Sequence, residues 1–298
     1  MTKVNWHQIF FISLSAIIIL LSTIPDLTGM SVLDKKSNIS IIMLISMTLI
    51  ATIGIAHGAL DGKIIWEHSI HKSTKLKLYL LYMFFTSSGA VLWFFYPFAG
   101  LVLLLLMSSV HFGVSDLEFI KEMPFVTKVY WGIVMTYLPS VFRSDQVDSL
   151  FFDLTQVHIH PEAYNIIKII VLICIINFLI SLYKIAKTRK KMGKINYELK
   201  LLTIEMAVLI YLAYVLTPLI WFAIYFCGLH GIRALIAGSF RVFPDILWLL
   251  LFTSPVSIVI FLFEWEYNLN SLLIVFPIVA SLTIAHMLLP KLIKIVGP

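Results

Sequence analysis

Long, uninterrupted apolar runs are the feature of this sequence that most restricts its fold. Several runs hold about 20 residues, the length that an α-helix needs to cross the hydrocarbon core of a bilayer. Of the 298 residues, 60% are hydrophobic and only 13% are charged, too few polar residues for a soluble protein of this size. Because the runs are continuous and not alternating, we expect membrane helices and not the strands of a β-barrel.

We expect an all-α integral membrane protein whose spans form one polytopic bundle. The bundle takes up the whole chain, residues 1–298, as a single domain, since no soluble segment is appended. Cys174 and Cys227 lie within apolar runs and are expected to be packing residues. The ten expected spans are 7–24, 39–60, 77–96, 98–119, 126–143, 164–183, 199–216, 218–238, 244–263 and 270–290.

Loop charges indicate which side of the membrane each loop occupies. Basic residues follow the second, fourth, sixth, eighth and tenth spans, most densely in "KIAKTRKKMGK" at 184–194. Acidic residues such as Asp145, Asp148 and Glu264 lie in the loops after the fifth and ninth spans. The positive-inside rule then places both termini in the cytoplasm and the chain in the inner membrane as a multi-pass protein. The net charge of +6 reflects this topology, so we expect no nucleic-acid partner.

One histidine lies near the end of each of four apolar runs. In the ten-span arrangement these four runs all lead toward the cytoplasm, so the four imidazoles should lie within one or two helical turns in depth. Ionisable groups at such depth face the bundle interior, and imidazole suits zinc, copper, iron or nickel. The sequence therefore predicts a metal site. Its expected ligands are His57, His111, His230 and His286.

Two carboxylates accompany these histidines. Asp61 lies one helical turn after His57, and Asp116 lies five residues after His111. Carboxylates beside metal-bound histidines commonly accept the second ring N–H and thereby fix the tautomer. We therefore expect Asp61 and Asp116 to accept hydrogen bonds from the metal-binding histidines and not to bind the metal themselves.

Two further charged residues lie in the expected spans. Arg233 follows His230 by three residues on the same helical face, where it either pairs with Asp61 or Asp116 or acts as a basic anchor on the cytoplasmic side. Glu205 lies inside the seventh span, where an unpaired charge is costly. It either belongs to a proton route or reaches a membrane interface.

Aromatic residues are dense in the third and eighth spans. Such surfaces suit a long, flat, apolar ligand that enters from the lipid, although aromatic residues are also common filler in membrane helices. A substrate tunnel would be lined by Trp93, Phe94, Trp221, Phe222 and Tyr225.

The histidine motifs, taken in order, are similar to those of a known family. "HGALD" (57–61), "HFGVSD" (111–116), "HGIR" (230–233) and "AHMLLP" (285–290) resemble the bacterial and archaeal membrane β-carotene 15,15′-dioxygenases, the Brp/Blh family. The resemblance runs from about the second span to the C-terminus. It implies a multi-span enzyme that holds non-haem iron(II), Fe(II), through histidines. Such an enzyme splits the central double bond of β-carotene with O₂ into two retinal molecules, commonly for a rhodopsin.

The resemblance assigns His57, His111 and His230 as iron ligands, with one departure. Members usually carry a second histidine four residues after the one that corresponds to His230, and this chain has Ala234 there. His286 could complete a set of four ligands. The implied partners are a lipophilic polyene, O₂ and membrane lipid, and a functional link to a retinal-binding rhodopsin.

Two other functions compete with a carotenoid-cleaving oxygenase. A transporter or channel would use the membrane histidines to move protons or metal ions, and it would spread polar residues along a path across the bilayer. Here the polar residues cluster at one depth, which counts against transport. Haem held by pairs of histidines is the other possibility. We therefore expect an iron-dependent dioxygenase that acts on a carotenoid.

Overall fold

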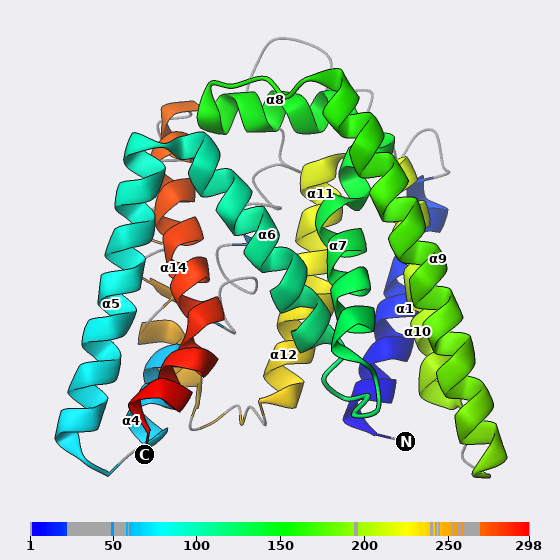
Figure 1. The fold of residues 1–298 in the computed structure, drawn as a ribbon, viewed down its shortest axis with the longest axis horizontal. Coiled ribbons are helices and arrows are strands. Elements are labelled where there is room, and N and C mark those ends of the chain that lie inside the picture. The colour runs from blue at the N-terminus through cyan, green and yellow to red at the C-terminus, as the bar shows by residue number, and fades with distance from the viewer. Residues whose placement is uncertain are drawn as a thin grey trace.

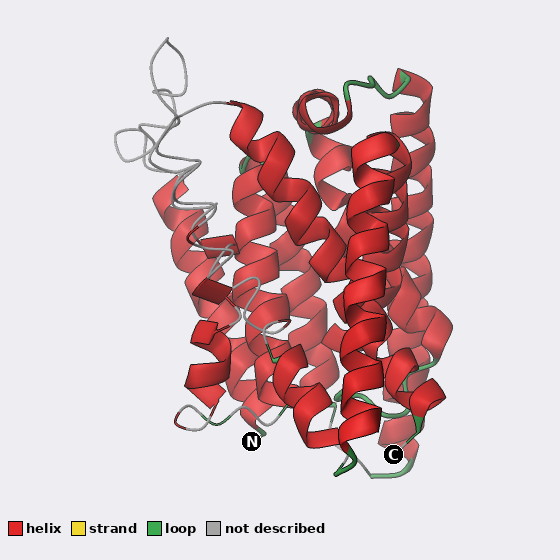
Figure 2. Cartoon of the chain, turned by 90° about the vertical axis from the view of Figure 1, so that its left-hand side faces the viewer, coloured by secondary structure: helices red, strands yellow, loops and turns green. Residues whose placement is uncertain are grey.

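The computed structural model describes most of the chain as helix. The described residues are 2–22, 49–50, 58, 60–68, 70–193, 196–238, 241, 243, 245–251, 253–254, 258 and 269–297, with the side chains of 21–22 and 269–275 left aside. Within these ranges the regular elements are helical and none is a strand (Figure 2). The expected all-α class is therefore confirmed.

Twelve helical segments follow one another along the described chain (Figure 1). They are α1 (Lys3–Ser22), α4 (Asp61–His68), α5 (Lys72–Phe95), α6 (Pro97–Asp116), α7 (Phe125–Phe142), α8 (Ser144–Thr155), α9 (Pro161–Lys191), α10 (Tyr197–Val215), α11 (Pro218–Ala223), η3 (Ile224–Gly231), α12 (Ile232–Ala237) and α14 (Leu269–Val296).

Six described segments are long and apolar enough to cross a membrane: α1, α5, α6, α9, the continuous run α11–η3–α12, and most of α14. Helices α7 and α10 have 18 and 19 residues and also fall on expected spans. Eight of the ten expected segments are thus helical. Of the other two, 39–60 lies largely and 244–263 partly outside the described residues, so the total of ten stays a prediction.

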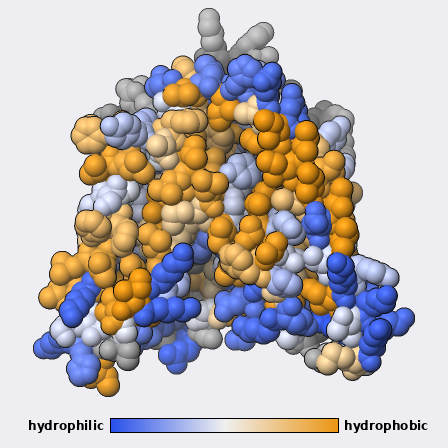
Figure 3. All heavy atoms as spheres, in the orientation of Figure 1, coloured by the Kyte–Doolittle hydropathy of each residue, from blue (hydrophilic) through white to orange (hydrophobic). Residues whose placement is uncertain are grey.

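The long helices stand side by side, and both chain ends lie at the same end of the bundle (Figures 1 and 2). This is the arrangement that an even number of crossings produces. Figure 3 shows apolar residues over much of the visible face and hydrophilic residues gathered near the chain termini and over α8. Such a surface suits a bilayer around the middle of the bundle. The cytoplasmic placement of the termini stays a prediction.

The largest apolar core lies between α6, α7, α9, α10 and η3. Trp131, Phe178 and Trp221 are among its fully buried side chains. Cys174 and Cys227 also lie in this core, as expected of packing residues. On the other side of α6, α14 packs along α5.

Glycines allow α6 and α7 to approach each other closely. A Cβ added at Gly113 would lie 1.9 Å from the carbonyl oxygen of Lys128, and one at Gly132 would lie 1.7 Å from that of Ser109. No side chain fits at either position without separating the backbones. These glycines therefore fix the depth at which α6 presents His111 to the interior of the bundle.

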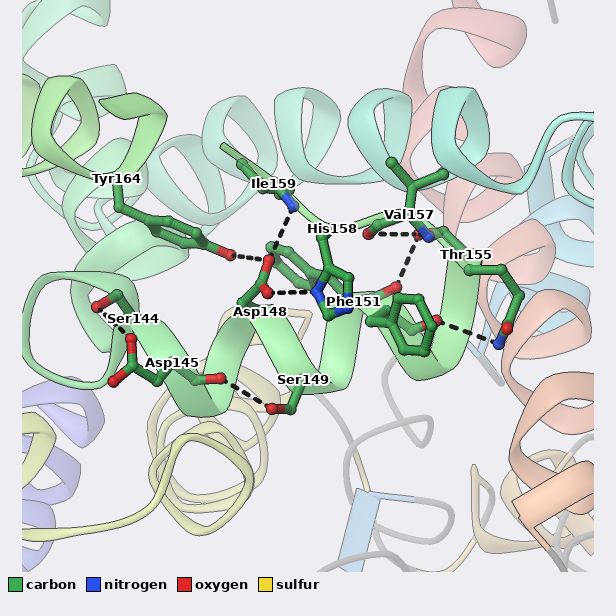
Figure 4. A network of polar contacts seen from close by, with 12 residues as sticks. Ser144, Asp145, Asp148, Ser149, Phe151, Thr155, Val157, His158, Ile159 and Tyr164 are labelled. Carbon is green, nitrogen blue, oxygen red and sulfur yellow. Dashed lines mark hydrogen bonds and ion pairs between the residues drawn. The ribbon is translucent and has the colours of Figure 1, made fainter. Parts of the chain in front are cut away.

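The acidic loop after α7 forms a short helix, α8, which the sequence did not reveal. It lies across the end of the bundle opposite the termini (Figure 1). Asp148 of α8 accepts hydrogen bonds from the backbone N–H of Ile159 at 2.8 Å, from His158 Nδ1 at 2.6 Å and from the Tyr164 hydroxyl at 3.3 Å (Figure 4). The segment between α8 and α9 is therefore tied to α8 through one carboxylate.

Candidate active site

Three of the four expected ligands lie together inside the bundle. They come from α6, η3 and α14, elements far apart in the sequence. The ring centroid of His111 is 5.2 Å from that of His230 and 5.1 Å from that of His286. His57 lies outside the described residues. Its neighbour Gly58 lies beside the cluster, since a Cβ there would be 3.6 Å from Cγ of His286.

A π-helix brings Tyr225 and His230 to one face of the eighth expected span. In an α-helix, residues five apart are separated by about 140° around the axis. With about 4.4 residues per turn in a π-helix, the separation falls to about 50°. Both residues lie in η3, and their rings lie 6.3 Å apart. The apolar pattern of 218–238 did not distinguish a π-helix from the expected α-helix.

Asp116 anchors His230 from the end of α6. Its Oδ1 accepts a hydrogen bond from His230 Nδ1 at 2.7 Å. Its Oδ2 accepts from the Tyr225 hydroxyl at 2.7 Å and from Trp131 Nε1 at 2.9 Å. Asp116, Tyr225, Trp131 and His230 are all buried. Three donors thus satisfy a carboxylate in an apolar interior and hold the imidazole in one tautomer and orientation.

Asp61 anchors His286 in the same way on the other side of the cluster. His286 Nδ1 donates to the Asp61 carboxylate, with distances of 2.8 and 2.9 Å to its two oxygens, and the Tyr82 hydroxyl donates at 3.0 Å. Each aspartate therefore joins a tyrosine hydroxyl and a histidine. The sequence placed these carboxylates near His57 and His111, whereas the structure pairs them with histidines of other helices.

The two further charged residues form an ion pair with each other. Arg233 Nη2 donates to Glu205 Oε1, and Arg233 Nη1 donates to the backbone carbonyl of Asp116 at 3.4 Å. One of the two alternatives for Arg233 was a pair with Asp61 or Asp116, and the structure shows Glu205 as its carboxylate partner instead. Arg233 is only 1% exposed and Glu205 is 0% exposed. A surface anchor at Arg233 and an interface position for Glu205 are therefore both wrong, because these side chains lie inside the bundle.

The cluster has the donor chemistry of a metal site. With Nδ1 of His230 and His286 bonded to carboxylates, Nε2 is the nitrogen that each ring could offer to a metal. Two imidazoles on one metal, with bonds of about 2.1 Å, have centroids roughly 5 Å apart, which matches the observed spacing. Within the described part of the chain, no three His, Cys, Asp or Glu side chains close into a metal-binding group. Metal binding stays a prediction that includes His57.

The five residues expected to line one substrate tunnel do not lie together in the structure. Trp221 and Tyr225 stack within the main core, with centroids 5.3 Å apart, and Phe222 is half-buried next to them. Trp93 packs on Phe276 in a different cluster. Phe94 is 81% exposed on the outside of the bundle.

Other aromatic residues contact the histidines directly. Phe112 packs against His230 with centroids 4.7 Å apart, and Phe226 stacks on the same ring at 5.7 Å. Neither contact was expected from the sequence, although Phe112 adjoins His111 in its motif. Nor were Tyr82 and Trp131 expected as partners of the aspartates, because nothing in the residue spacing links them.

Comparison with known proteins agrees with the motifs. A family model described as beta-carotene 15,15'-dioxygenase matches residues 48–294. A beta-carotene 15,15'-dioxygenase from an uncultured marine bacterium, 66A03, is 28% identical over 198 residues, which cover 63% of this chain. The aligned part spans 66% of that relative, just under two thirds of its length. No solved structure matches the chain.

Proposed function

Because this chain belongs to the β-carotene 15,15′-dioxygenase family, we propose that it is a membrane oxygenase that cleaves a carotenoid. The reaction is the splitting of the central double bond of β-carotene by O₂ to give two molecules of retinal. The observation that carries the proposal is the convergence of His111, His230 and His286, two of them held through Nδ1 by buried aspartates.

The proposed cofactor is a non-haem iron(II) held by His57, His111, His230 and His286. Iron(II) would supply the activation of O₂. His286 takes the place of the ligand lost at Ala234, and its support by Asp61 matches the support of His230 by Asp116. Because His286 and His230 are supported in the same way, we infer that both bind the iron.

The chain's own residues orient the ligands and keep the site dry. Asp61 and Asp116 direct Nε2 of their histidines into the cluster and retain the Nδ1 protons. Phe112 and Phe226 cover His230 with apolar surface, which suits a polyene and excludes water from the reacting bond. The substrate enters from the surrounding lipid of the inner membrane, and the retinal product fits a link to a rhodopsin.

The test is expression of the chain in a bacterium that accumulates β-carotene, followed by retinoid extraction and iron analysis of the purified protein. We expect retinal and near-stoichiometric iron, both lost in His111→Ala, His230→Ala and His286→Ala. The matched control is His160→Ala, because this exposed histidine lies in the loop between α8 and α9. A folded, iron-loaded protein that leaves carotenoids intact would refute the reaction, and a folded protein without iron would refute the site.

A further inference from the structure

Helix α1 carries buried polar side chains that the proposed site does not yet use. Its run is mostly apolar, yet His7, Gln8 and Ser15 are buried inside the bundle. A polar side chain in a membrane interior is costly unless it finds a partner. His7 is the first residue of the first expected span, 7–24, and the sequence suggested no role for it.

His7 contacts the π-helix directly. Its Nε2 donates to the backbone carbonyl of Gly228 at 2.9 Å, two residues before His230. Phe11, one turn further along α1, is also buried and faces Gly228, where a Cβ would lie 3.5 Å from its ring. Side-chain bonds to helix carbonyls are one way in which a helix departs from α geometry. Helix α1 therefore bonds to η3 within the segment that carries His230.

Gln8 contacts the same site by a second route. Its Nε2 donates to Glu205 Oε2 at 3.2 Å. Glu205 pairs with Arg233, and Arg233 reaches the backbone carbonyl of Asp116, whose side chain holds His230. His7 and Gln8 are thus both connected to His230. His7 is connected through the backbone of η3, and Gln8 through the buried Arg233–Glu205 pair.

We propose that α1 is a positioning element of the active site, in which His7 and Gln8 hold η3 and the Arg233–Glu205 pair and thereby place His230. Helix α1 precedes the residues that the family model matches, so the family match assigns it no role. The effect on catalysis rests on the proposed oxygenase function, whereas the effect on η3 does not.

Cys227 provides a readout of η3 that is independent of activity. It lies in η3 next to Gly228 and is buried, so a maleimide reaches its thiol only when the segment opens locally. The experiment uses the full chain in detergent with Cys174→Ala as the parent. The variants are His7→Leu and Gln8→Leu, which remove the donors, and His7→Gln, which keeps one. Phe10→Ala is the control on α1, because Phe10 is 60% exposed on its outer face.

We expect Cys227 to react with N-ethylmaleimide at least about fivefold faster in His7→Leu and Gln8→Leu than in the parent. In the same variants, kcat for β-carotene should fall about tenfold, with KM changed by less than about twofold. His7→Gln should stay close to the parent in both readouts.

Labelling of both leucine variants at the rate of Phe10→Ala would overturn the proposal, whatever happens to activity. Equal acceleration in His7→Leu and His7→Gln would also overturn it, because loss of ring packing would then explain the effect. If the parent forms no retinal, the oxygenase assignment fails, while the labelling series still decides whether α1 holds η3.

Discussion

Among single residues, Asp61 and Asp116 determine the orientation of the two histidines that they bind. Neither lies next to its partner in the sequence, since Asp116 is 114 residues from His230 and Asp61 is 225 residues from His286. Each binds Nδ1 of its histidine, so each fixes which nitrogen faces the cluster. The aspartates are therefore the residues whose removal should weaken the site without removing a ligand.

We predict that Asp116→Asn lowers iron affinity about 10- to 100-fold. Three donors converge on this carboxylate, and an amide NH₂ group cannot accept from them. The measurement is retained iron during titration with a chelator. Asp145→Asn, in α8 at the far end of the fold, is the matched control. Unchanged iron retention in Asp116→Asn would contradict the assigned role.

The buried Arg233–Glu205 pair leads to a second prediction at this scale. Arg233→Leu leaves the Glu205 carboxylate without its counter-ion in the bundle interior, which costs about 3–5 kcal/mol. The double variant Arg233→Leu with Glu205→Leu should be much less destabilised than the single change, because no charge remains buried. Thermal unfolding of the wild type, Arg233→Leu, Glu205→Leu and the double variant in one detergent measures this coupling. Additive effects of the two changes would show that the pair is not coupled.

At the scale of elements, the close crossing of α6 and α7 depends on two glycines. We predict that Gly132→Ala separates these helices, because its Cβ would overlap the carbonyl oxygen of Ser109 at 1.7 Å. Large loss of folded protein on size-exclusion chromatography is expected. Gly89→Ala is the control, since its Cβ would meet Ser281 at 3.3 Å and requires only a small shift. Equal yields of the two variants would contradict the assigned role of this crossing.

Helix α8 and the segment after it provide a prediction about pH. Although burial alone would raise the pKa of Asp148, the Ile159 N–H and the His158 ring hold this pKa below its usual value of 3.8. A carboxyl whose pKa is lowered on folding stabilises the fold above its unfolded pKa, and the stabilisation is lost as the pH falls through the folded pKa. Hydrogen exchange in residues 156–160 should therefore rise below about pH 4, and Asp148→Asn should raise it at pH 7. Equal protection in Asp148→Asn and wild type at pH 7 would contradict this.

The elements also show what sequence patterns can and cannot predict. Apolar length located the helices at eight expected segments, because the bilayer dictates that length. The same pattern could not reveal η3, since an apolar run looks alike whether it winds as an α- or a π-helix. Nor could it reveal α8, whose acidic residues indicated a loop. The expected depth of each histidine along its helix was enough to predict that the histidines lie together. Their hydrogen-bond partners depend on how each helix is rotated about its own axis, and residue spacing does not encode that rotation.

At the scale of the whole molecule, the two ends of the bundle differ in charge and in structure. The end that carries both termini also carries the basic C-terminal end of α9, and the opposite end carries α8 with its aspartates (Figure 1). The positive-inside rule assigns the first end to the cytoplasm. On this assignment, which stays a prediction, the histidine cluster would lie toward the cytoplasmic side of the membrane, and the product of the proposed reaction would be released near that leaflet.

We predict that a membrane-impermeant maleimide labels His160→Cys in intact cells and labels Met192→Cys only after the cells are opened. Both positions are exposed, one in the loop after α8 and the other at the end of α9. The native cysteines are buried and provide a low background. The reverse labelling pattern would show that the whole molecule has the opposite orientation in the membrane. Because the helices are fixed relative to one another, it would move the histidine cluster to the outer leaflet and require the carotenoid to be cleaved there.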